Sequence, residues 1–336
     1  MFKGQTILFP SHPVITSSAA VVGPVEGKGP LAEDFDKIYD DLLLHQDSWE
    51  KAERKLMLEA AKIAIKKSGM KSEDIQFYIG GDLMDQIVSS SFSARQLGIP
   101  FLGVFGACST AMESLALAAM MVDSSKATAV LAGTCSHNAS AEKQFRYPTE
   151  YGSQKPPSAQ YTVTGAGASI VQAKGRGPLI TSATIGKVID LGVKDPFQMG
   201  AAMAPSAVDT IEAHCRDLNI APGEYDLIVT GDLAKIGHSL ALDLFAEKNF
   251  PIDQTTYKDC GLMIYDIEKQ EVQSGGSGCG CSASVTYGHI LKQLQAGEYE
   301  KILVVATGSL LSPLTYQQGE SIPCVAHAVA LQRGRK

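Results

Sequence analysis

Hydrophobic residues recur along the chain in short runs that are bounded by glycine. The runs at residues 75–81 (IQFYIGG) and 225–231 (YDLIVTG) carry few charged side chains and are too short for ordinary helices. Such runs are typical of strands that are buried on both faces of a sheet. Residues 127–133 and 301–308 have the same character. A further strand is predicted at residues 6–9, and the first part of the chain after it shows no regular pattern.

Longer segments between these runs have the spacing of amphipathic helices. Residues 48–69 place Leu56, Ala60 and Ala64 on one face and charged side chains on the opposite face, and residues 205–218 follow the same pattern. Strands that alternate with such helices predict parallel sheets that are covered by helices on both faces.

The order of these elements occurs twice along the chain. Each of the two first strands is followed by an Asp-Leu pair, which begins at Asp82 in one case and at Asp232 in the other. A turn of small residues then begins a helix, at residues 106–122 (GACSTAMESLALAAMMV) and again at residues 278–294 (GCGCSASVTYGHILKQL). We therefore predict a duplicated α/β unit.

The duplication divides the chain into two halves. We place the N-terminal half at residues 1–175 and the C-terminal half at residues 176–336. The C-terminal half carries an insertion, in which a pair of strands is expected at residues 261–267 and 271–273. The N-terminal half contains residues 140–161, which are rich in Gln, Pro, Tyr and charge. Irregular stretches of this length are usually functional covers or partner surfaces, so we expect a cover loop there.

Composition and charge narrow the class of partner. Of the 336 residues, 45% are hydrophobic and 19% are charged, so the chain can bury a substantial core. The net charge of -7 argues against nucleic acid as the main partner, because it repels a phosphate backbone. No segment approaches the ~20 apolar residues that span a bilayer, and the start lacks the apolar core of a secretory signal. We expect a protein that is made in the cytosol and is soluble or peripheral to a membrane.

Cys108 is the residue with the most informative surroundings. It lies in the sequence GACST, between a predicted buried strand at residues 101–105 and the first turn of an apolar helix. A thiol at a helix N-terminus experiences the positive end of the macrodipole, which favours the thiolate and attracts carboxylates. A small buried cysteine that fills space beneath a tight turn is the alternative interpretation. The seven cysteines are odd in number and scattered, so no disulfide framework is expected.

A reactive thiol needs a base and donors for an oxyanion. His137, at the end of a predicted strand, is the nearest histidine by topology, and His238, His289 and His327 are further options. A lone histidine is more often a structural residue than a catalyst. In the cover loop, Arg146 and its basic and aromatic neighbours could hold an anion or stack on a flat ring.

The glycine-rich turn at residues 275–284 (GGSGCGCSAS) is the second-half counterpart of the Cys108 turn. It lacks the lysine and the spacing of a phosphate-binding loop. Cys279 and Cys281 form a C-x-C motif without a second pair of ligands, so they cannot complete a tetrahedral metal site. We expect these thiols to pack in the interior, and we predict neither a metal nor a cofactor.

The duplicated series of helix, strand, GACST turn, long helix and strand resembles the thiolase and ketoacyl-synthase superfamily. Residues 163–170 (VTGAGASI) also resemble the Gly-Ala-Gly segment at which a strand of those enzymes begins. The resemblance implies an α/β protein with the thiolase-like fold, in which two pseudo-symmetric βα halves are layered α-β-α-β-α.

Almost the whole chain is similar to the stage V sporulation protein AD family of endospore-forming bacteria. This resemblance implies a protein that binds dipicolinic acid (pyridine-2,6-dicarboxylate), with calcium, and helps to move it into the forespore and out at germination. It also implies a peripheral subunit on the forespore or spore inner membrane, where other subunits form the channel. The similarity is carried by VGPVEGKGPL (22–31), DSWEKAE (47–53), GDLMDQ (81–86), IPFLGVFGACSTAMESLALA (99–118), AEKQFRYPTEYGSQKP (141–156) and GDLAKIGHSL (231–240).

The chain departs from the condensing enzymes of the superfamily at two places. Residues 230–232 (Thr-Gly-Asp) match the place of their catalytic histidine, and residues 278–282 match the loop of their catalytic asparagine. Cys108 is retained without either partner, and such groups act as a unit. We therefore expect a binding protein and not an enzyme. Two alternatives stay open, namely an acyltransferase that forms a thioester on Cys108 and a docking scaffold with a vestigial pocket.

These considerations give a set of candidate ligand-binding residues. A planar dicarboxylate needs two cationic or N–H-rich ends with an apolar slot between them. We expect Cys108, His137, Arg146 and Ser282 to line the pocket, with no catalytic residue. By analogy with related enzymes, we also expect a homodimer that forms through the strand at residues 127–133.

Overall fold

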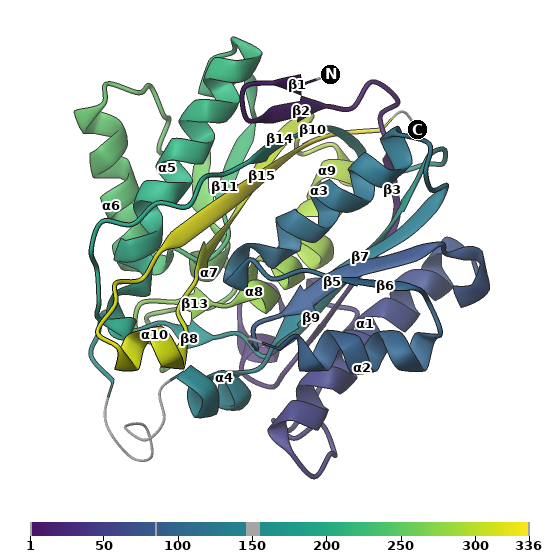
Figure 1. Ribbon diagram of the computed structural model, residues 1–336, viewed down its shortest axis with the longest axis horizontal. Helices are drawn as coiled ribbons and strands as arrows, with labels where there is room; N and C mark the ends of the chain where they lie inside the picture. Colours follow the sequence, from purple (N-terminus) through teal and green to yellow (C-terminus); the bar gives the residue numbers. More distant parts are fainter. Residues whose placement is uncertain (1, 85, 146–154, 335–336) are drawn as a thin grey trace.

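The computed structural model describes residues 2–84, 86–145 and 155–334, and in these ranges the chain forms fifteen strands and ten α-helices (Figure 1). The strands are β1 (Phe2–Lys3), β2 (Thr6–Leu8), β3 (Val14–Val22), β4 (Lys37–Ile38), β5 (Phe77–Asp82), β6 (Phe101–Gly103), β7 (Ala129–Ser136), β8 (Tyr161–Thr162), β9 (Gly165–Gln172), β10 (Leu179–Ile185), β11 (Leu227–Thr230), β12 (Tyr257–Asp259), β13 (Gly276–Ser277), β14 (Lys301–Ser309) and β15 (Cys324–Gln332). The α-helices are α1 (Trp49–Ser68), α2 (Val88–Leu97), α3 (Thr110–Asp123), α4 (Asn138–Phe145), α5 (Met199–Leu218), α6 (Ala234–Glu247), α7 (Cys260–Met263), α8 (Cys279–Ser284), α9 (Leu291–Ala296) and α10 (Pro313–Gln317).

Most of the described strands join one mixed sheet whose order repeats. Its path runs β12-β11-β14-β15-β10 and then β3-β9-β7-β5-β6. In each set the three outer strands are parallel and the two inner strands alternate in direction. The two sets meet at a single pair of residues, Leu179 and Val14. The boundary predicted at residue 175 falls between β9 and β10, and the division into two domains stays a prediction.

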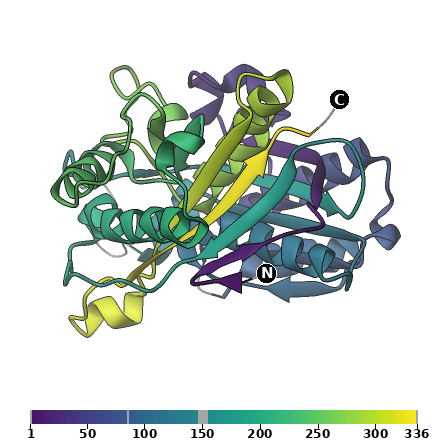
Figure 2. The ribbon, with the colours of Figure 1, turned by 90° about the horizontal axis from the view of Figure 1, so that it is seen from above.

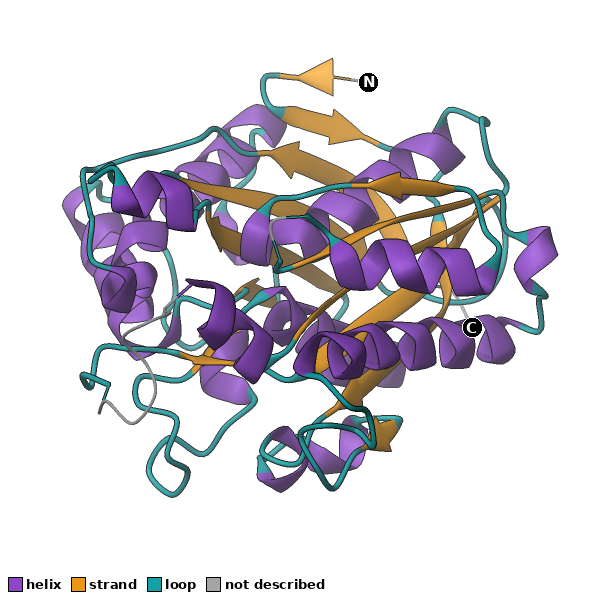
Figure 3. Cartoon of the chain, turned by 60° about the horizontal axis from the view of Figure 1, so that its bottom comes forward, coloured by secondary structure: helices purple, strands orange, loops and turns teal. Residues whose placement is uncertain are grey.

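Helices cover and separate the two sets of strands. α1 and α2 pack on the outer face of the first set, and α5 and α6 pack on the outer face of the second (Figures 1 and 2). α3 and α8 lie between the sets and contact strands of both. Separate hydrophobic clusters fill the two outer interfaces and the central one. Figure 3 shows the resulting alternation of helices and strands, which is the layered arrangement that the sequence predicts.

The two long outer helices have equal lengths and well-defined ends. α1 begins after Ser48, whose Oγ accepts from Lys51 N at 3.3 Å, and ends at Gly69, which has a φ of 74°. The prediction for residues 48–69 is thus confirmed. α5 begins at Met199, earlier than the predicted start at Pro205, because a capped 3-10 turn leads directly into it and the proline is accommodated inside the helix.

The sheet is mixed, so the prediction of parallel sheets was wrong. β9 and β15 are antiparallel to both of their neighbours, since a long connection can bring a strand back in either direction. The sequence also missed β3, where Ser17 and Ser18 interrupt the apolar run. Their hydroxyls donate to Ala64 O at 2.8 Å and Tyr287 O at 2.9 Å, on helices on opposite sides of the sheet.

Two predicted strands differ from the structure. The run at residues 101–105 is not buried: β6 lies at the edge of the sheet and pairs with β5 alone among the described strands, and Leu102 is 46% exposed. The pair at residues 261–267 and 271–273 is absent from the described residues. Cys260–Met263 form a helical turn there, and Asp266 O accepts from two following N–H groups, so the chain turns instead of extending.

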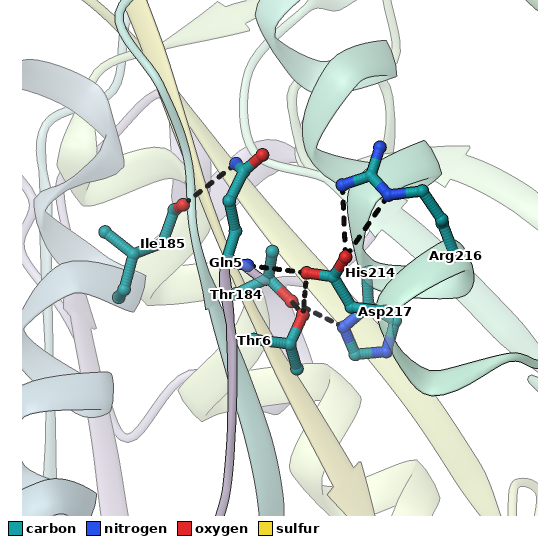
Figure 4. A network of polar contacts seen from close by, with 7 residues as sticks. All are labelled: Gln5, Thr6, Thr184, Ile185, His214, Arg216 and Asp217. Carbon is teal, nitrogen blue, oxygen red and sulfur yellow. Dashed lines mark hydrogen bonds and ion pairs between the residues drawn. The ribbon is translucent and has the colours of Figure 1, made fainter. Parts of the chain in front are cut away.

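A polar network ties the N-terminal strand β2 to the second half (Figure 4). Asp217 accepts from Gln5 N at 2.6 Å and from Thr6 Oγ1 at 3.2 Å. Thr6 also bonds to Thr184, whose hydroxyl lies 2.8 Å away, and Thr184 contacts His214 Nδ1 at 2.7 Å. The first residues of the chain are therefore held by β10 and α5 of the other half.

Candidate functional site

The turn that carries Cys108 is held by its own hydroxyl groups. A 3-10 turn leads into α3. Thr110 Oγ1 accepts from Gly106 N at 3.0 Å and donates to Ala107 O at 2.7 Å, and Ser109 Oγ donates to Gly106 O at 2.6 Å. These bonds hold Ala107 at a φ of 50°. The start of α3 is therefore a rigid platform for the thiol.

The Cys108 side chain faces a cavity between the two halves of the chain. Its empty volume is about 440 Å³, which includes space open to solvent, whereas the space available to the centre of a water-sized sphere is only about 30 Å³. Cys108 itself is 4% exposed. The described residues that line the cavity are Leu83, Phe105, Ala107, Cys108, Ala141, Glu142, Phe145, Thr162, Met199, Ser277, Ser309 and Leu311.

Asp232 interacts with the Cys108 thiol from the opposite half of the chain. The carboxyl group is fully buried. It accepts from Thr307 Oγ1 at 2.6 Å, from Gly278 N at 2.9 Å and from Ser277 Oγ at 3.3 Å. Burial raises the pKa of Asp232 to about 7, although these hydrogen bonds oppose the shift. Asp232 therefore titrates close to neutral pH beside the sulfur.

The pKa of the Cys108 thiol is raised well above its ordinary value. Burial is the main cause, and the negative charge of Asp232 adds to it. The expectation that the start of α3 lowers this pKa was therefore wrong. Loss of solvent at a nearly closed site outweighs the effect of the helix end, and the added carboxylate repels a thiolate.

His137 does not line the cavity. Its Nε2 lies 2.7 Å from Leu42 O, its Nδ1 accepts from Ala139 N at 3.1 Å, and its ring packs against Trp49 at 5.7 Å between centroids. Burial lowers the pKa of His137, so the ring is neutral near pH 7. The structure thus keeps this predicted site residue in a structural contact with the segment before α1.

The other histidines considered as bases also lie outside the cavity lining of the described residues. The His238 ring stacks on Tyr257 with centroids 4.8 Å apart. His289 Nδ1 lies 2.6 Å from a carboxylate oxygen of Asp34, and His327 Nδ1 accepts a backbone hydrogen bond. Each ring has a local partner that explains its position.

Ser282 is likewise outside the lining. It is fully buried in α8, and its Oγ donates to Cys279 O at 3.4 Å within the same helix. Cys279 donates to Cys135 O at 2.9 Å, and Cys281 is fully buried. The second-half loop instead contributes Ser277 to the cavity.

The predicted cover loop begins as a helix. α4 includes residues 140–145 and supplies three lining residues, among them Glu142 and Phe145. Glu142 forms an ion pair with Lys155 at 2.6 Å. Arg146, the predicted cationic contact, lies outside the described residues. Among the described lining residues the ionisable side chains are those of Cys108 and Glu142, so this part of the cavity supplies no cation.

A metal ion has one group of potential ligands among the described residues. Asp40, Asp41 and His45 place their donor atoms within reach of one another on the segment before α1. Asp40 and His45 are exposed and Asp41 is half-buried, and none of the three lines the cavity.

Sequence reasoning missed Asp232 as a site residue. Its signal was present, because the Asp-Leu pair repeats after both first strands and because Asp232 falls where condensing enzymes carry their histidine. What the sequence did not reveal is that only one of the two aspartates interacts with the Cys108 thiol.

Comparison with known proteins agrees with the resemblance described above. Residues 3–332 match the family model described as stage V sporulation protein AD. The stage V sporulation protein AD of Bacillus subtilis (strain 168) is 51% identical over 330 residues, which cover 98% of this chain and 97% of that protein.

Solved structures of condensing enzymes and thiolases share the fold. OleA of Xanthomonas campestris with bound cerulenin has a TM-score of 0.63 at 14% identity, with 97% of this chain and all of that chain covered (100%). 3-Oxoacyl-[acyl-carrier-protein] synthase III of Aquifex aeolicus has a TM-score of 0.58 at 14% identity over 95% and 99% of the two chains. Human mitochondrial 3-ketoacyl-CoA thiolase has a TM-score of 0.59 at 12% identity over 96% and 99%. These similarities confirm the thiolase-like fold.

The length and hydropathy of the helices determine whether one of them could cross a bilayer. Within the described part of the chain, none combines the length and the hydropathy that crossing a membrane requires.

Proposed function

This chain belongs to the stage V sporulation protein AD family, and from that premise we propose that it binds dipicolinic acid with calcium and does not transform it. A role in sporulation follows from the family. We propose further that the protein is a peripheral subunit of the spore membrane complex that moves this ligand during sporulation and germination. The observation that carries the proposal is a cavity beside Cys108 whose described lining contains no histidine.

The charge of the cavity favours a neutral form of the ligand. A free dicarboxylate would meet Glu142 in the lining and would lie close to Asp232 beside the Cys108 thiol. Its own two negative charges would lose their hydration without a cation from the described lining. In the calcium complex, the metal offsets both ligand carboxylates. We therefore expect calcium dipicolinate to bind more tightly than dipicolinate alone.

The space beside the sulfur also constrains the proposal. The volume of about 440 Å³ between the lining side chains includes space open to solvent, so it overstates the room for a ligand. The freely available part, about 30 Å³, holds a water or two but no pyridine ring. Binding therefore requires lining side chains to move, and Phe105, Phe145 and Met199 are the largest of them.

Calorimetry tests this proposal directly. Purified protein is titrated with dipicolinate, with and without calcium, and binding is expected to be strongest with calcium. Cys108→Trp should abolish the heat signal because the indole fills the cavity, whereas Cys108→Ala should keep it. Unchanged affinity in the tryptophan variant would place the ligand elsewhere, and no heat in the unaltered protein would reject the function.

The acyltransferase alternative is supported by the fold of the condensing enzymes and by the position of Cys108 at the start of α3. In that alternative Asp232 is the titratable group at hand to accept the thiol proton. Its charge raises the pKa of the thiol, which opposes thiolate formation. Incubation with acyl-CoA followed by intact mass measurement separates the two functions, since a stable adduct on Cys108 would favour the enzyme.

We also propose a homodimer, but not through the strand predicted for it. β7 pairs with β9 on one side and with β5 on the other, so its backbone has no free edge. β6 is the available edge on this side of the sheet, and Leu102 on it is 46% exposed. Light scattering of Leu102→Asp should show a shift to monomer; an unchanged dimer mass would exclude this edge.

A further inference from the structure

The outer face of α1 is strongly basic in a protein with a net charge of -7. The helix carries six basic residues and three acidic ones, and one of the acidic residues, Glu53, is buried. Helical spacing places Lys51, Lys55, Lys62 and Lys66 along one side, which is the side away from the sheet. The exposed ridge of α1 is therefore a line of positive charge.

Part of this charge has no acidic partner among the described residues. Lys51 pairs with Asp47 at 2.7 Å, and Lys55 Nζ donates to Leu44 O at 2.8 Å. Lys62 and Lys66 are both exposed, and neither forms an ion pair with a described residue. The C-terminal half of the ridge is thus free to meet an external anion.

α2 extends the basic face with an exposed aromatic ring. Phe92 is 37% exposed, and its ring lies 5.3 Å from the Arg54 guanidinium and 4.5 Å from the Arg95 guanidinium. Ser93 Oγ donates to Arg54 O at 3.1 Å, which fixes α2 beside α1. Two guanidinium groups are therefore held around one ring without a described carboxylate partner, although such groups bind phosphate well.

The second half of the chain provides an internal comparison. α5 has the same length as α1 and the same place outside its sheet, yet it carries one arginine and three acidic residues. α6 adds one lysine and two acidic residues. Figure 1 shows the α1–α2 layer and the α5–α6 layer on opposite sides of the molecule. Because duplicated helices differ in this way, the basic face is a property of the first half and not of the fold.

We propose that the exposed face of α1 and α2 docks the protein on an anionic lipid bilayer. Basic residues near such a surface each strengthen binding. The acidic helices α5 and α6 lie on the opposite side of the molecule, where salt screens their charge from the bilayer. Phe92, between its two arginines, enters the headgroup region, where aromatic rings with polar neighbours are favourable. This inference depends on the proposed function only in assuming that the protein is located at a membrane.

Vesicle sedimentation tests the docking face. The full-length protein should bind vesicles of phosphatidylcholine mixed with phosphatidylglycerol, should not bind pure phosphatidylcholine, and should dissociate in ~1 M salt. The double variant Lys62→Glu with Lys66→Glu should bind at least about 25-fold more weakly, because each basic residue contributes roughly fivefold. Phe92→Ser should cause a smaller loss.

The matched control reverses two exposed lysines of the second half, Lys235→Glu with Lys258→Glu, which changes the net charge equally. It should bind anionic vesicles as the unaltered protein does. The proposal is overturned if the α1 variant and the control lose vesicle binding to the same extent. It is also overturned if the unaltered protein does not bind anionic vesicles and binds only to an acidic protein partner. Calorimetry with calcium dipicolinate separates the two proposals, since the α1 variant should keep ligand binding.

Discussion

The two halves of the chain each begin a central helix with a cysteine in a turn of small residues, but only one of the two cysteines lines the cavity. Cys108 is 4% exposed and lines the cavity. Cys279 is fully buried, its thiol donates to Cys135 O, and the turn is fastened further by the bond from Gly280 N to Ser136 Oγ at 3.1 Å. Duplication has thus produced two similar turns, and the segments that pack against each turn determine whether a ligand can bind beside it.

The aspartates that follow the first strand of each half differ in the same way. Asp82 accepts from Met84 N at 3.2 Å and from Ser90 N at 2.7 Å, both within its own half. Asp232 instead accepts from groups that follow it by many residues and reaches the Cys108 thiol. One aspartate holds its own loop, and the other forms part of the site.

A third aspartate explains why Asp232 is free for that role. Asp259, at the end of β12, accepts from Leu233 N at 2.8 Å and from Ala234 N at 2.9 Å. It therefore satisfies the backbone at the start of α6, as Asp82 does near α2. In the second half, Asp259 and not Asp232 therefore caps the helix that follows the first strand.

The largest expected effect comes from a bulky side chain at each of the two turns. Cys279→Trp should lower the free energy of unfolding by at least about 3 kcal/mol, because the site is closed and overpacking is costly. Cys108→Trp should cost clearly less, because the large side chains that line the partly open cavity can move aside for the indole. Chemical denaturation of both variants, with the alanine variants as controls, measures the difference. Equal losses would mean that the two turns are packed alike.

The next effect separates the two aspartates by their response to pH. The raised pKa of Asp232 means that its contribution is present at low pH and is lost as pH rises toward about 7, by up to about 1.4 kcal/mol per pH unit. Asp232→Asn should remove this loss, because an amide does not ionise and its Oδ1 can still accept from Thr307 Oγ1. Burial also raises the pKa of Asp82, but only to about 6, so its contribution is lost at lower pH than that of Asp232. Asp82→Asn should in addition destabilise at every pH, because an amide offers only one acceptor to the two N–H donors.

Melting temperatures of both variants from pH 4 to pH 8 (roughly the range that these pKa values span) check this prediction. A slope in Asp232→Asn as steep as that of the unaltered protein would contradict the assigned titration.

A smaller effect distinguishes the two long outer helices at acidic pH. The sixteenth residue is Ala64 in α1 and His214 in α5. Burial lowers the pKa of His214 to about 4, so its contribution is present above pH ~6.5 and is lost as pH falls toward 4. His214→Gln, which keeps polar contacts to Thr184 and Tyr225, should reduce this acid sensitivity. Denaturant titrations at pH 7 and pH 5 compare the variants, and an identical drop in both would refute the role of His214.

The smallest effect is expected at exposed ion pairs of the outer layers. Lys37 and Glu59 lie 2.6 Å apart beside α1, and Lys248 and Glu212 lie 2.6 Å apart beside α5. Both pairs are partly solvated, so Lys37→Ala and Lys248→Ala should each change stability by less than about 1 kcal/mol. Denaturant melts in low and high salt measure this change. A larger loss of stability at either position would show that the ion pair contributes more than a solvated surface pair does.

The sequence predicts the elements whose pattern is local and misses those whose role depends on distant contacts. α1 and the repeated strands follow from hydrophobic spacing. β3 was missed because the carbonyl groups that accept from Ser17 and Ser18 belong to helices far away in the chain. The exposed edge strand β6 was predicted as buried because its residues are apolar, although no strand covers its outer side among the described residues.

The same distinction between local patterns and distant contacts applies to the residues of the site. Cys108 could be selected from its turn, because the small residues and the helix start are adjacent in sequence. His137 follows β7 and Ser282 lies in α8, but neither side chain lines the cavity. The His137 ring contacts Leu42 O, which is distant in the chain, and Ser282 Oγ donates to Cys279 O of its own helix. Asp232 could be recognised only once the fold had brought the second half against the first.

The pairing of β2 with β10 has a consequence for biosynthesis. Thr6 lies opposite Thr184, so β2 can pair only with the short strand β1 until more than half of the chain has been translated. At about 5–20 residues per second this delay is roughly 10–35 s. A nascent chain halted before β10 should therefore leave its N-terminal strand open to proteases or chaperones, and a released full-length chain should protect it.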